Sequence, residues 1–265
     1  MKLHHVKAVL VRQLFLLRKN FTRFINIFLW LSLDVIVWGF TTKYLSSVGE
    51  SSFSFIPVFL GAIILFGFLV RAQQGITLPF FEDVWSRNFL NLFASPLKIN
   101  EYILGLVSTS ILTGAASIAV VVILASAAFH FSLFSLGLPL LLFLLIIFIF
   151  GLSLGIATIS LVLRVGPSAE WFSWIIPFIL NPLSGVLYPI SVLPGGVQVI
   201  SKLIPTSYVF EGLREIVLHQ TFSAKPLLIG LALAIFYLCL AYTIFVHTFK
   251  IVRRNGLLAR FSSEI

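Results

Sequence analysis

Charged residues are scarce in this sequence of 265 residues: they make up 10% of it, whereas hydrophobic residues make up 59%. Soluble domains carry about 25% charged residues, so the composition excludes an ordinary soluble fold. Continuous apolar runs of about 20 residues recur along the chain, as transmembrane helices require. The period-two alternation of transmembrane β-strands is missing. The composition therefore predicts an all-α polytopic membrane protein.

Cysteine is nearly absent, since Cys239 is the only one and no intrachain disulfide can form. The five histidines lack the spacing of metal ligands, and no metal site is predicted. The sequence also lacks a G-x-x-x-x-G-K-[ST] phosphate loop, because the glycine pair in LPGGVQV (residues 193–199) is followed by neither the lysine nor the hydroxyl residue. We therefore expect this chain to bind no cofactor, to be no enzyme, and to take energy for any active transport from a partner.

Acidic residues are half as numerous as basic ones, 9 against 18, which gives a net charge of +9. A basic chain can bind nucleic acid, but basic residues beside apolar runs are also expected on the cytoplasmic side of a membrane. The second interpretation fits the position of the charges better, so no nucleic-acid partner is predicted.

The apolar runs predict six transmembrane helices. Their approximate ranges are 24–40, 53–70, 102–129, 136–163, 171–188 and 227–249. We found no internal repeat that relates the first three spans to the last three.

The distribution of basic residues predicts the orientation of these spans. An even number of spans places both termini on one side. Most basic residues then fall on that side: Lys2, Lys7, Arg12, Arg18, Lys19 and Arg23 before the first span, Arg71, Arg87 and Lys98 between the second and third, Arg164, and Lys250, Arg253, Arg254 and Arg260 after the last. By the positive-inside rule both termini are cytoplasmic. The predicted location is a cell membrane, with the bacterial inner membrane as the expected type.

Residues 1–23 combine basic and apolar side chains ahead of the first span. On a helical wheel one arc holds Leu3, Val6, Leu10, Leu14, Leu17, Phe21 and Phe24, while basic residues lie elsewhere. This pattern predicts an amphipathic interface helix lying on the inner leaflet, in contact with membrane lipids. Docking of Phe15 and its neighbours on another protein is the alternative.

The loop between the second and third spans predicts a short amphipathic helix over residues 79–96. Pro79 suits a first helical turn, Glu82 and Asp83 favour the positive end of the helix dipole, and Pro96 stops the helix. Such a helix either floats among lipid headgroups or docks on a cytosolic partner. The acidic pair favours the partner, because anionic lipids attract basic residues.

Residues 178–208 are apolar but interrupted by proline and glycine. They contain Pro182, Pro189, Pro194 and Pro205, together with Gly185, Gly195 and Gly196. Broken backbone at membrane depth is tolerated only where protein or a water-filled cavity covers it. We therefore predict that residues 182–222 form a re-entrant helical hairpin and a short helix on the outer side, facing a partner subunit or a transport path.

Two stretches together resemble the membrane-spanning (permease) subunits of type-2 ABC exporters. The first is FFEDVWSRNFLNLFASPLKINEYILG, residues 80–105. The second is NPLSGVLYPISVLPGGVQVISKLIPTSYVFEGLREIV, residues 181–217. The likeness extends over nearly the whole chain, since size, span number and the position of both motifs agree, and residues 1–265 are interpreted as a single transmembrane domain.

The resemblance implies that the chain pairs with a second permease, expected to be a copy of itself, and with two cytosolic ATPase subunits that bind ATP and Mg²⁺. It implies that the helix at 79–96 is a coupling helix seated on the ATPase. The residues expected to couple are Glu82, Asp83, Trp85, Arg87 and Asn88. The residues expected at an outer gate are Pro182, Gly185, Tyr188, Pro189, Pro194, Pro205, Tyr208, Glu211 and Arg214.

Asp34 and Trp30 are candidates for a translocation path. Asp34 lies in the middle of the first span, and an ionisable residue within a span is a functional candidate by default. The alternatives for Asp34 are that it pairs locally, stays protonated or faces a water-filled path without contacting substrate. For Trp30 the alternative is interfacial anchoring and packing.

The expected function is the export of a drug-like, lipid or lipid-linked molecule. A lipid-linked polysaccharide is an alternative cargo. An intramembrane lipid-modifying enzyme is an alternative of another class, although no cluster of catalytic side chains is visible in the sequence.

Overall fold

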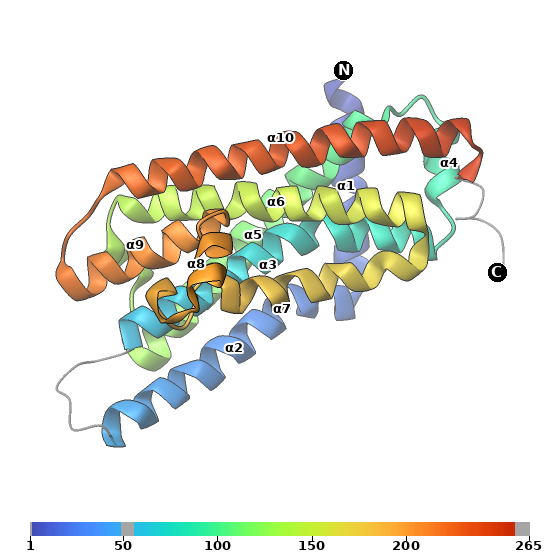
Figure 1. The fold of residues 1–265 in the computed structure, drawn as a ribbon. Helices are drawn as coiled ribbons and strands as arrows, with labels where there is room; N and C mark the ends of the chain where they lie inside the picture. The colour runs from blue at the N-terminus through green and yellow to red at the C-terminus, as the bar shows by residue number, and fades with distance from the viewer. Residues whose placement is uncertain (1, 49–55, 258–265) are drawn as a thin grey trace.

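The computed structural model describes residues 2–48 and 56–257, and it is all helical with no strand in those ranges. Five helices are long and apolar enough to cross a membrane: α2 (Phe21–Val48), α3 (Ile56–Trp85), α5 (Ile99–Phe129), α6 (Pro139–Val165) and α10 (Ala224–Arg254). They run roughly along one axis (Figure 1). The predicted spans 24–40, 102–129 and 227–249 fall within α2, α5 and α10. The predicted span 53–70 falls within α3 apart from residues 53–55, which lie outside the described ranges, and the predicted span 136–163 begins three residues before α6.

The shorter elements gather toward the ends of the bundle. The helix α1 (Leu3–Lys19) crosses it near the end where α10 finishes, and α4 (Phe89–Ala94) lies at that same end (Figure 1). We call this the α4 end. Toward the opposite end lie α8 (Gly195–Ser201), α9 (Pro205–His219) and the 3-10 turns Leu133–Leu136 and Ile190–Val192.

The predicted fifth span differs from the structure. Residues 171–188 contain no long helix: a 3-10 turn, Pro167–Trp171, leads into the 12-residue helix α7 (Phe172–Leu183). Pro177 and Pro182 lie inside α7 and remove two backbone donors, and Gly185 then turns the chain at a φ of +66°. The apolar run is therefore divided where its prolines and glycine predict a break.

The interior consists of two packed hydrophobic clusters, one toward each end. The cluster at the α4 end includes the fully buried Phe80, Phe81, Phe89, Tyr102 and Phe245. The other includes Leu60, Ile64, Phe143, Phe210 and Leu213. Because α3 contributes to both clusters and packs against α5 and α6, it is the central helix of the bundle.

Small residues let α3 approach its neighbours closely. A Cβ added at Gly75 would lie 2.7 Å from Ser110 Cα on α5, and one added at Gly151 on α6 would lie 2.8 Å from the Leu69 carbonyl oxygen. The Ser110 hydroxyl donates to the Ala72 carbonyl at 2.9 Å. Small residues and hydroxyl hydrogen bonds at such crossings are typical of helices packed within a membrane.

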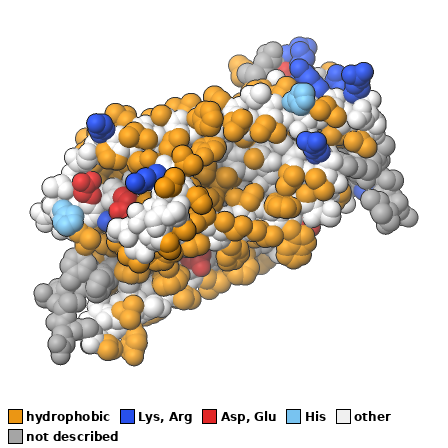
Figure 2. Space-filling model, in the orientation of Figure 1, with side chains coloured by type: hydrophobic (Ala, Val, Ile, Leu, Met, Phe, Trp, Pro, Cys, Tyr) orange, Lys and Arg blue, Asp and Glu red, His pale blue; other side chains and the backbone are white. Residues whose placement is uncertain are grey.

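The distribution of side chains on the surface fits a bundle of membrane-spanning helices. Figure 2 shows hydrophobic side chains covering most of the middle of one face, with basic side chains gathered at the α4 end. The apolar arc predicted for α1 is divided: Leu17 is buried, whereas Leu3, Leu14 and Phe21 are exposed. The face of α1 that packs on α5 is instead Val9, Gln13 and Leu17.

Candidate functional site

The helix predicted over 79–96 is two elements in the structure. Helix α3 continues through Pro79 to Trp85, and α4 starts only at Phe89. Ile76, Phe80 and Val84 follow one face at four-residue spacing and are all buried, so packing on both sides of Pro79 outweighs the hydrogen bond that proline cannot donate. The prediction that Pro79 begins a helix is wrong, and Glu82 and Asp83 lie in the last turn of α3 rather than in a first turn.

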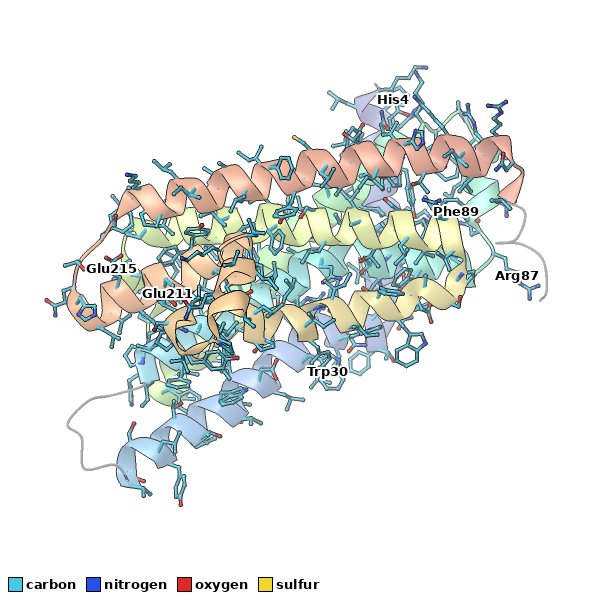
Figure 3. All side chains as sticks on the ribbon, viewed as in Figure 1. His4, Trp30, Arg87, Phe89, Glu211 and Glu215 are labelled. Atoms are coloured by element: carbon cyan, nitrogen blue, oxygen red, sulfur yellow. The ribbon has the colours of Figure 1, made fainter. Side chains whose placement is uncertain are left out.

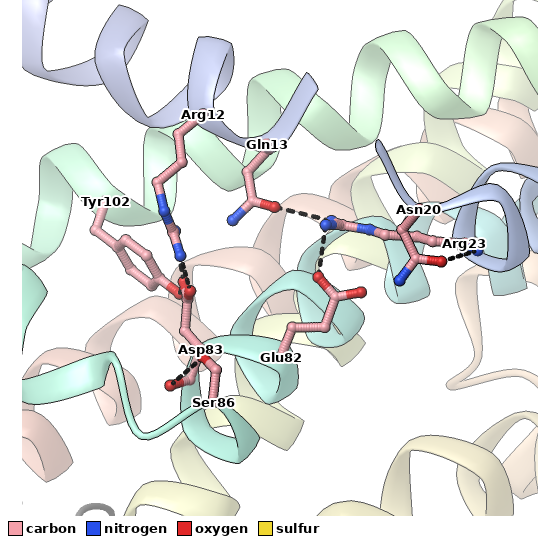
Figure 4. Close-up of polar contacts among 8 residues, drawn as sticks. All are labelled: Arg12, Gln13, Asn20, Arg23, Glu82, Asp83, Ser86 and Tyr102. Carbon is pink, nitrogen blue, oxygen red and sulfur yellow. Dashed lines mark hydrogen bonds and ion pairs between the residues drawn. The ribbon is translucent and has the colours of Figure 1, made fainter. Parts of the chain in front are cut away.

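Asp83 is a buried carboxylate at the centre of a polar cluster (Figure 4). Its side chain is 1% exposed and accepts hydrogen bonds from both terminal nitrogens of Arg12 and, at 2.8 Å, from the Tyr102 hydroxyl. Burial alone would lower the pKa of Arg12, but the hydrogen bond and charge of Asp83 outweigh burial and raise that pKa above its ordinary value. Arg12 is therefore charged at every working pH, and the pair fastens α1 to α3.

Glu82 makes a second link between the same parts of the chain. It pairs with Arg23 at 2.5 Å, and Arg23 also donates to the Gln13 side-chain oxygen at 2.8 Å. The acidic pair was interpreted as a polar face that a partner could bind. The structure instead places both carboxylates in contacts within the chain.

Glu101 is a second buried carboxylate, at the start of α5. It accepts the backbone N–H groups of Lys2 at 2.7 Å and Lys98 at 3.1 Å, and His5 Nδ1 lies 2.7 Å from it. Glu101 thus caps α5 and holds the beginning of α1 against it. Arg12, Arg23, Tyr102 and Glu101 were missed as site residues, because sequence spacing does not relate side chains up to 99 residues apart.

The segment between α3 and α4 is a tight turn. Its backbone N–H groups donate back to α3, from Ser86 to Glu82, from Arg87 to Val84 and from Asn88 to Asp83. Arg87 adopts a positive φ of 55°, and its side chain points away from the bundle (Figure 3). The Trp85 indole donates to Glu170 at 2.8 Å. Of the predicted coupling residues, Trp85 and Arg87 are exposed and Asp83 is buried.

Helix α4 offers an exposed face beside this turn. Asn91, Ala94, Ser95 and Pro96 are exposed, while Phe89 anchors the helix in the core against Phe80 and Tyr102. A rigidly anchored helix with a small polar face can dock on another protein.

The predicted gate residues meet at the opposite end of the bundle. Arg214 on α9 is 6% exposed and donates to the carbonyl oxygens of Gly185 and, at 3.0 Å, of Val186. It also contacts Glu211 at 3.1 Å, and Glu211 accepts the Ile190 N–H at 2.8 Å. The burial of Arg214 and its bonds to two backbone carbonyls make it a clamp that holds the turn after α7 against α9.

The remaining gate residues shape the same segment. The Tyr188 hydroxyl donates to the Pro182 carbonyl at 3.1 Å, and the Tyr208 hydroxyl to the Lys202 carbonyl at 2.8 Å. Pro189 and Pro194 precede the short helices after the turn, and Pro205 is the first residue of α9. Ser184 and Thr206, which were not predicted, share a buried hydrogen bond of 2.9 Å.

The two path candidates, Trp30 and Asp34, both lie on α2. Trp30 is 60% exposed and its indole donates to Asn26 at 2.8 Å, and Figure 3 shows its ring projecting outward. Asp34 is exposed and makes no hydrogen bond or ion pair to another described residue. Trp30 lines a cavity of about 440 Å³. The cavity lies between the first part of α2 on one side and helices α3, α5 and α7 on the other.

No group of three His, Cys, Asp or Glu side chains in residues 2–48 and 56–257 could hold a metal ion. No curated protein sequence matches the chain. The sequence model of the ABC-2 type transporter family matches residues 5–218, which include α1, the predicted coupling region and the Arg214 clamp. The chain belongs to the ABC-2 type transporter family, and it is a membrane-spanning permease of an ABC transporter.

Proposed function

We propose that this permease exports an amphiphilic molecule, which is drug-like, a lipid or lipid-linked, as a homodimer driven by two ATPase subunits. ATP and Mg²⁺ bind in the ATPases, since the chain has no phosphate loop. Both termini are cytoplasmic and the membrane is a bacterial inner membrane. The basic side chains gathered at the α4 end support this orientation (Figure 2).

The observation that carries the proposal is the position of α4. It lies at the basic end of the bundle, between two long helices, with Asn91 and Ala94 exposed and Phe89 fixed in the core. We assign the seat for the ATPase to this exposed face and to the turn before it. The buried Asp83 then passes a displacement of α4 to α1, because it binds Arg12 and Tyr102 at the base of the turn.

A large charged side chain on the exposed face of α4 tests whether the ATPase binds there. Ala94→Arg is expected to lower the substrate-stimulated ATPase activity of the reconstituted complex at least tenfold, because the side chain would separate α4 from its partner. Thr221→Arg, an exposed substitution at the other end, serves as the control and leaves the activity within twofold. Equal activities of the two variants would refute the assignment of α4 as the ATPase seat.

The exposure of Asp34 supports the presence of a second copy of the permease beside α2. An isolated carboxylate facing lipid at the centre of a span is costly, so such groups face other protein or a water-filled path. Asp34 is exposed on the single chain, in the middle of a helix that is mostly unburied. We infer that the second permease and the path between the two copies cover it.

Asp34→Asn is therefore expected to reduce export of an amphiphilic fluorescent dye by proteoliposomes about tenfold, while the complex still elutes at its assembled size. Removing the charge alters the path without removing volume. Val37→Ala, a neighbouring exposed change on the same helix, is the control. Unchanged export by Asp34→Asn would exclude Asp34 from the path.

A further inference from the structure

The cavity that Trp30 lines also contains a buried arginine, and none of the described carboxylates pairs with it. Arg71, at the midpoint of α3, is 6% exposed. One of its terminal nitrogens donates to Gln74 at 3.0 Å and to the Asn26 carbonyl at 3.5 Å, and its Nε–H has no acceptor. No ion pair joins Arg71 to an acid in residues 2–48 or 56–257. The prediction placed Arg71 in a cytoplasmic loop, and the structure places it inside a membrane-spanning helix instead.

The charges around the cavity do not balance. Arg23, Arg71 and Glu82 are the charged residues that line it. Glu82 pairs with Arg23, so the charge of Arg71 is left over. A guanidinium has five donors and no acceptor, and Arg71 has only two neutral acceptors here, the Gln74 side-chain oxygen and the Asn26 backbone carbonyl. A buried cation in this state is favourable only if an anion or water completes its partners.

Part of the cavity wall is apolar and aromatic, beside polar residues such as Asn20, Asn26 and Thr109. Trp30, Trp85 and Trp174 line it from α2, α3 and α7, together with Ile27 and Leu78. Its volume of about 440 Å³ is within the range of sites for small organic ligands. An inorganic anion would satisfy Arg71 but leave these walls uncovered, whereas an apolar molecule would cover the walls but leave Arg71 unpaired.

We propose that this cavity binds an anionic amphiphile, with its phosphate or carboxylate group on Arg71 and its apolar part against the tryptophans. Arg71 suits this role because its planar donor group binds both oxygens of such an anion. Binding at this site does not require the ATPase seat or the direction of transport proposed above.

Tryptophan fluorescence tests the site directly, because three of the five tryptophans line the cavity. The full chain, in phosphatidylcholine nanodiscs, is titrated with dodecyl phosphate. We expect a saturable change, and none with dodecyltrimethylammonium, which carries the opposite charge on the same tail. Equal responses to the two amphiphiles would overturn the anion preference. Inorganic phosphate that binds as tightly as dodecyl phosphate would overturn the role of the apolar walls.

Variants of the cavity residues test which of them bind dodecyl phosphate. Arg71→Gln is expected to weaken dodecyl phosphate binding at least tenfold, and Arg71→Lys less, because it keeps the charge. Arg164→Gln, which removes an exposed arginine elsewhere, leaves binding unchanged. If Arg71→Gln does not fold, Trp174→Ala and Trp171→Ala decide, since both are exposed but only Trp174 lines the cavity. At least threefold weaker binding in Trp174→Ala alone supports the site, and equal effects refute it.

Discussion

Replacing Asp83 with alanine lowers the free energy of unfolding by about 3–5 kcal/mol, the usual cost of removing one partner of a buried ion pair. The buried carboxylate accepts hydrogen bonds from the buried Tyr102 hydroxyl and from Arg12, whose side chain is 30% exposed. Its loss leaves a charged guanidinium and a buried hydroxyl without an acceptor. Thermal unfolding of the purified permease in mild detergent measures the effect.

The neighbouring acid provides the matched control. Glu82→Gln breaks a pair whose carboxylate is partly exposed, and the expected loss is about 1 kcal/mol or less. A double variant, Arg12→Met with Asp83→Leu, should recover much of the stability lost in Asp83→Ala, because it leaves no unpaired charge. A single variant Asp83→Ala as stable as the wild type would show that this cluster does not hold α1 in place.

Replacing Arg214 with leucine has the second large effect, at the opposite end. It removes the donor to Gly185 and Val186 and the partner of Glu211, with an expected cost of about 3 kcal/mol. Because these contacts hold the turn after α7, we expect a cysteine introduced at Val186, which is buried, to become reactive toward a water-soluble maleimide. Labelling rates in the Arg214→Leu and parent backgrounds measure the opening.

Two further variants separate geometry from charge at this clamp. Arg214→Lys keeps the charge but cannot reproduce the forked donors, so it should release Val186 nearly as much as leucine does. Glu215→Gln, one residue further along α9 and outside the contacts that form the clamp, should not change the labelling rate. Slow labelling of Val186→Cys in Arg214→Leu would mean that the turn holds without the arginine.

The long helices could be predicted from the sequence because hydropathy and length are local properties. Helices α2, α5, α6 and α10 each contain a predicted span. The end of α3 could not be predicted in the same way. Pro79 has the local features of a helix start, but the burial of Phe80 and Phe81 depends on residues far away in the sequence.

The polar clusters were partly predictable. Glu211 and Arg214 are three residues apart on one helix, and this spacing alone places them in contact. The partners of Asp83 were not predictable, because Arg12 is 71 residues away and its position in the sequence also suits a lipid-facing helix. Arg71 was misplaced because a single charge after an apolar run is the usual sign that a span has ended.

The close crossings at Gly75 and Gly151 also limit how this permease can move. These crossings leave no room for a side chain at Gly75 or Gly151. If the helices slid so that a larger residue reached either position, its atoms would clash with the neighbouring helix, so α3, α5 and α6 shift together as one rigid body. Helix α2 is held to this body in the same way, because a Cβ added at Gly39 would clash with Phe129 on α5, and one added at Gly67 on α3 would clash with Leu31 on α2. A transport cycle that preserves these crossings would therefore change the width of the tryptophan-lined cavity through α7, which contributes Trp174 to it and has no such glycine crossing among the described residues.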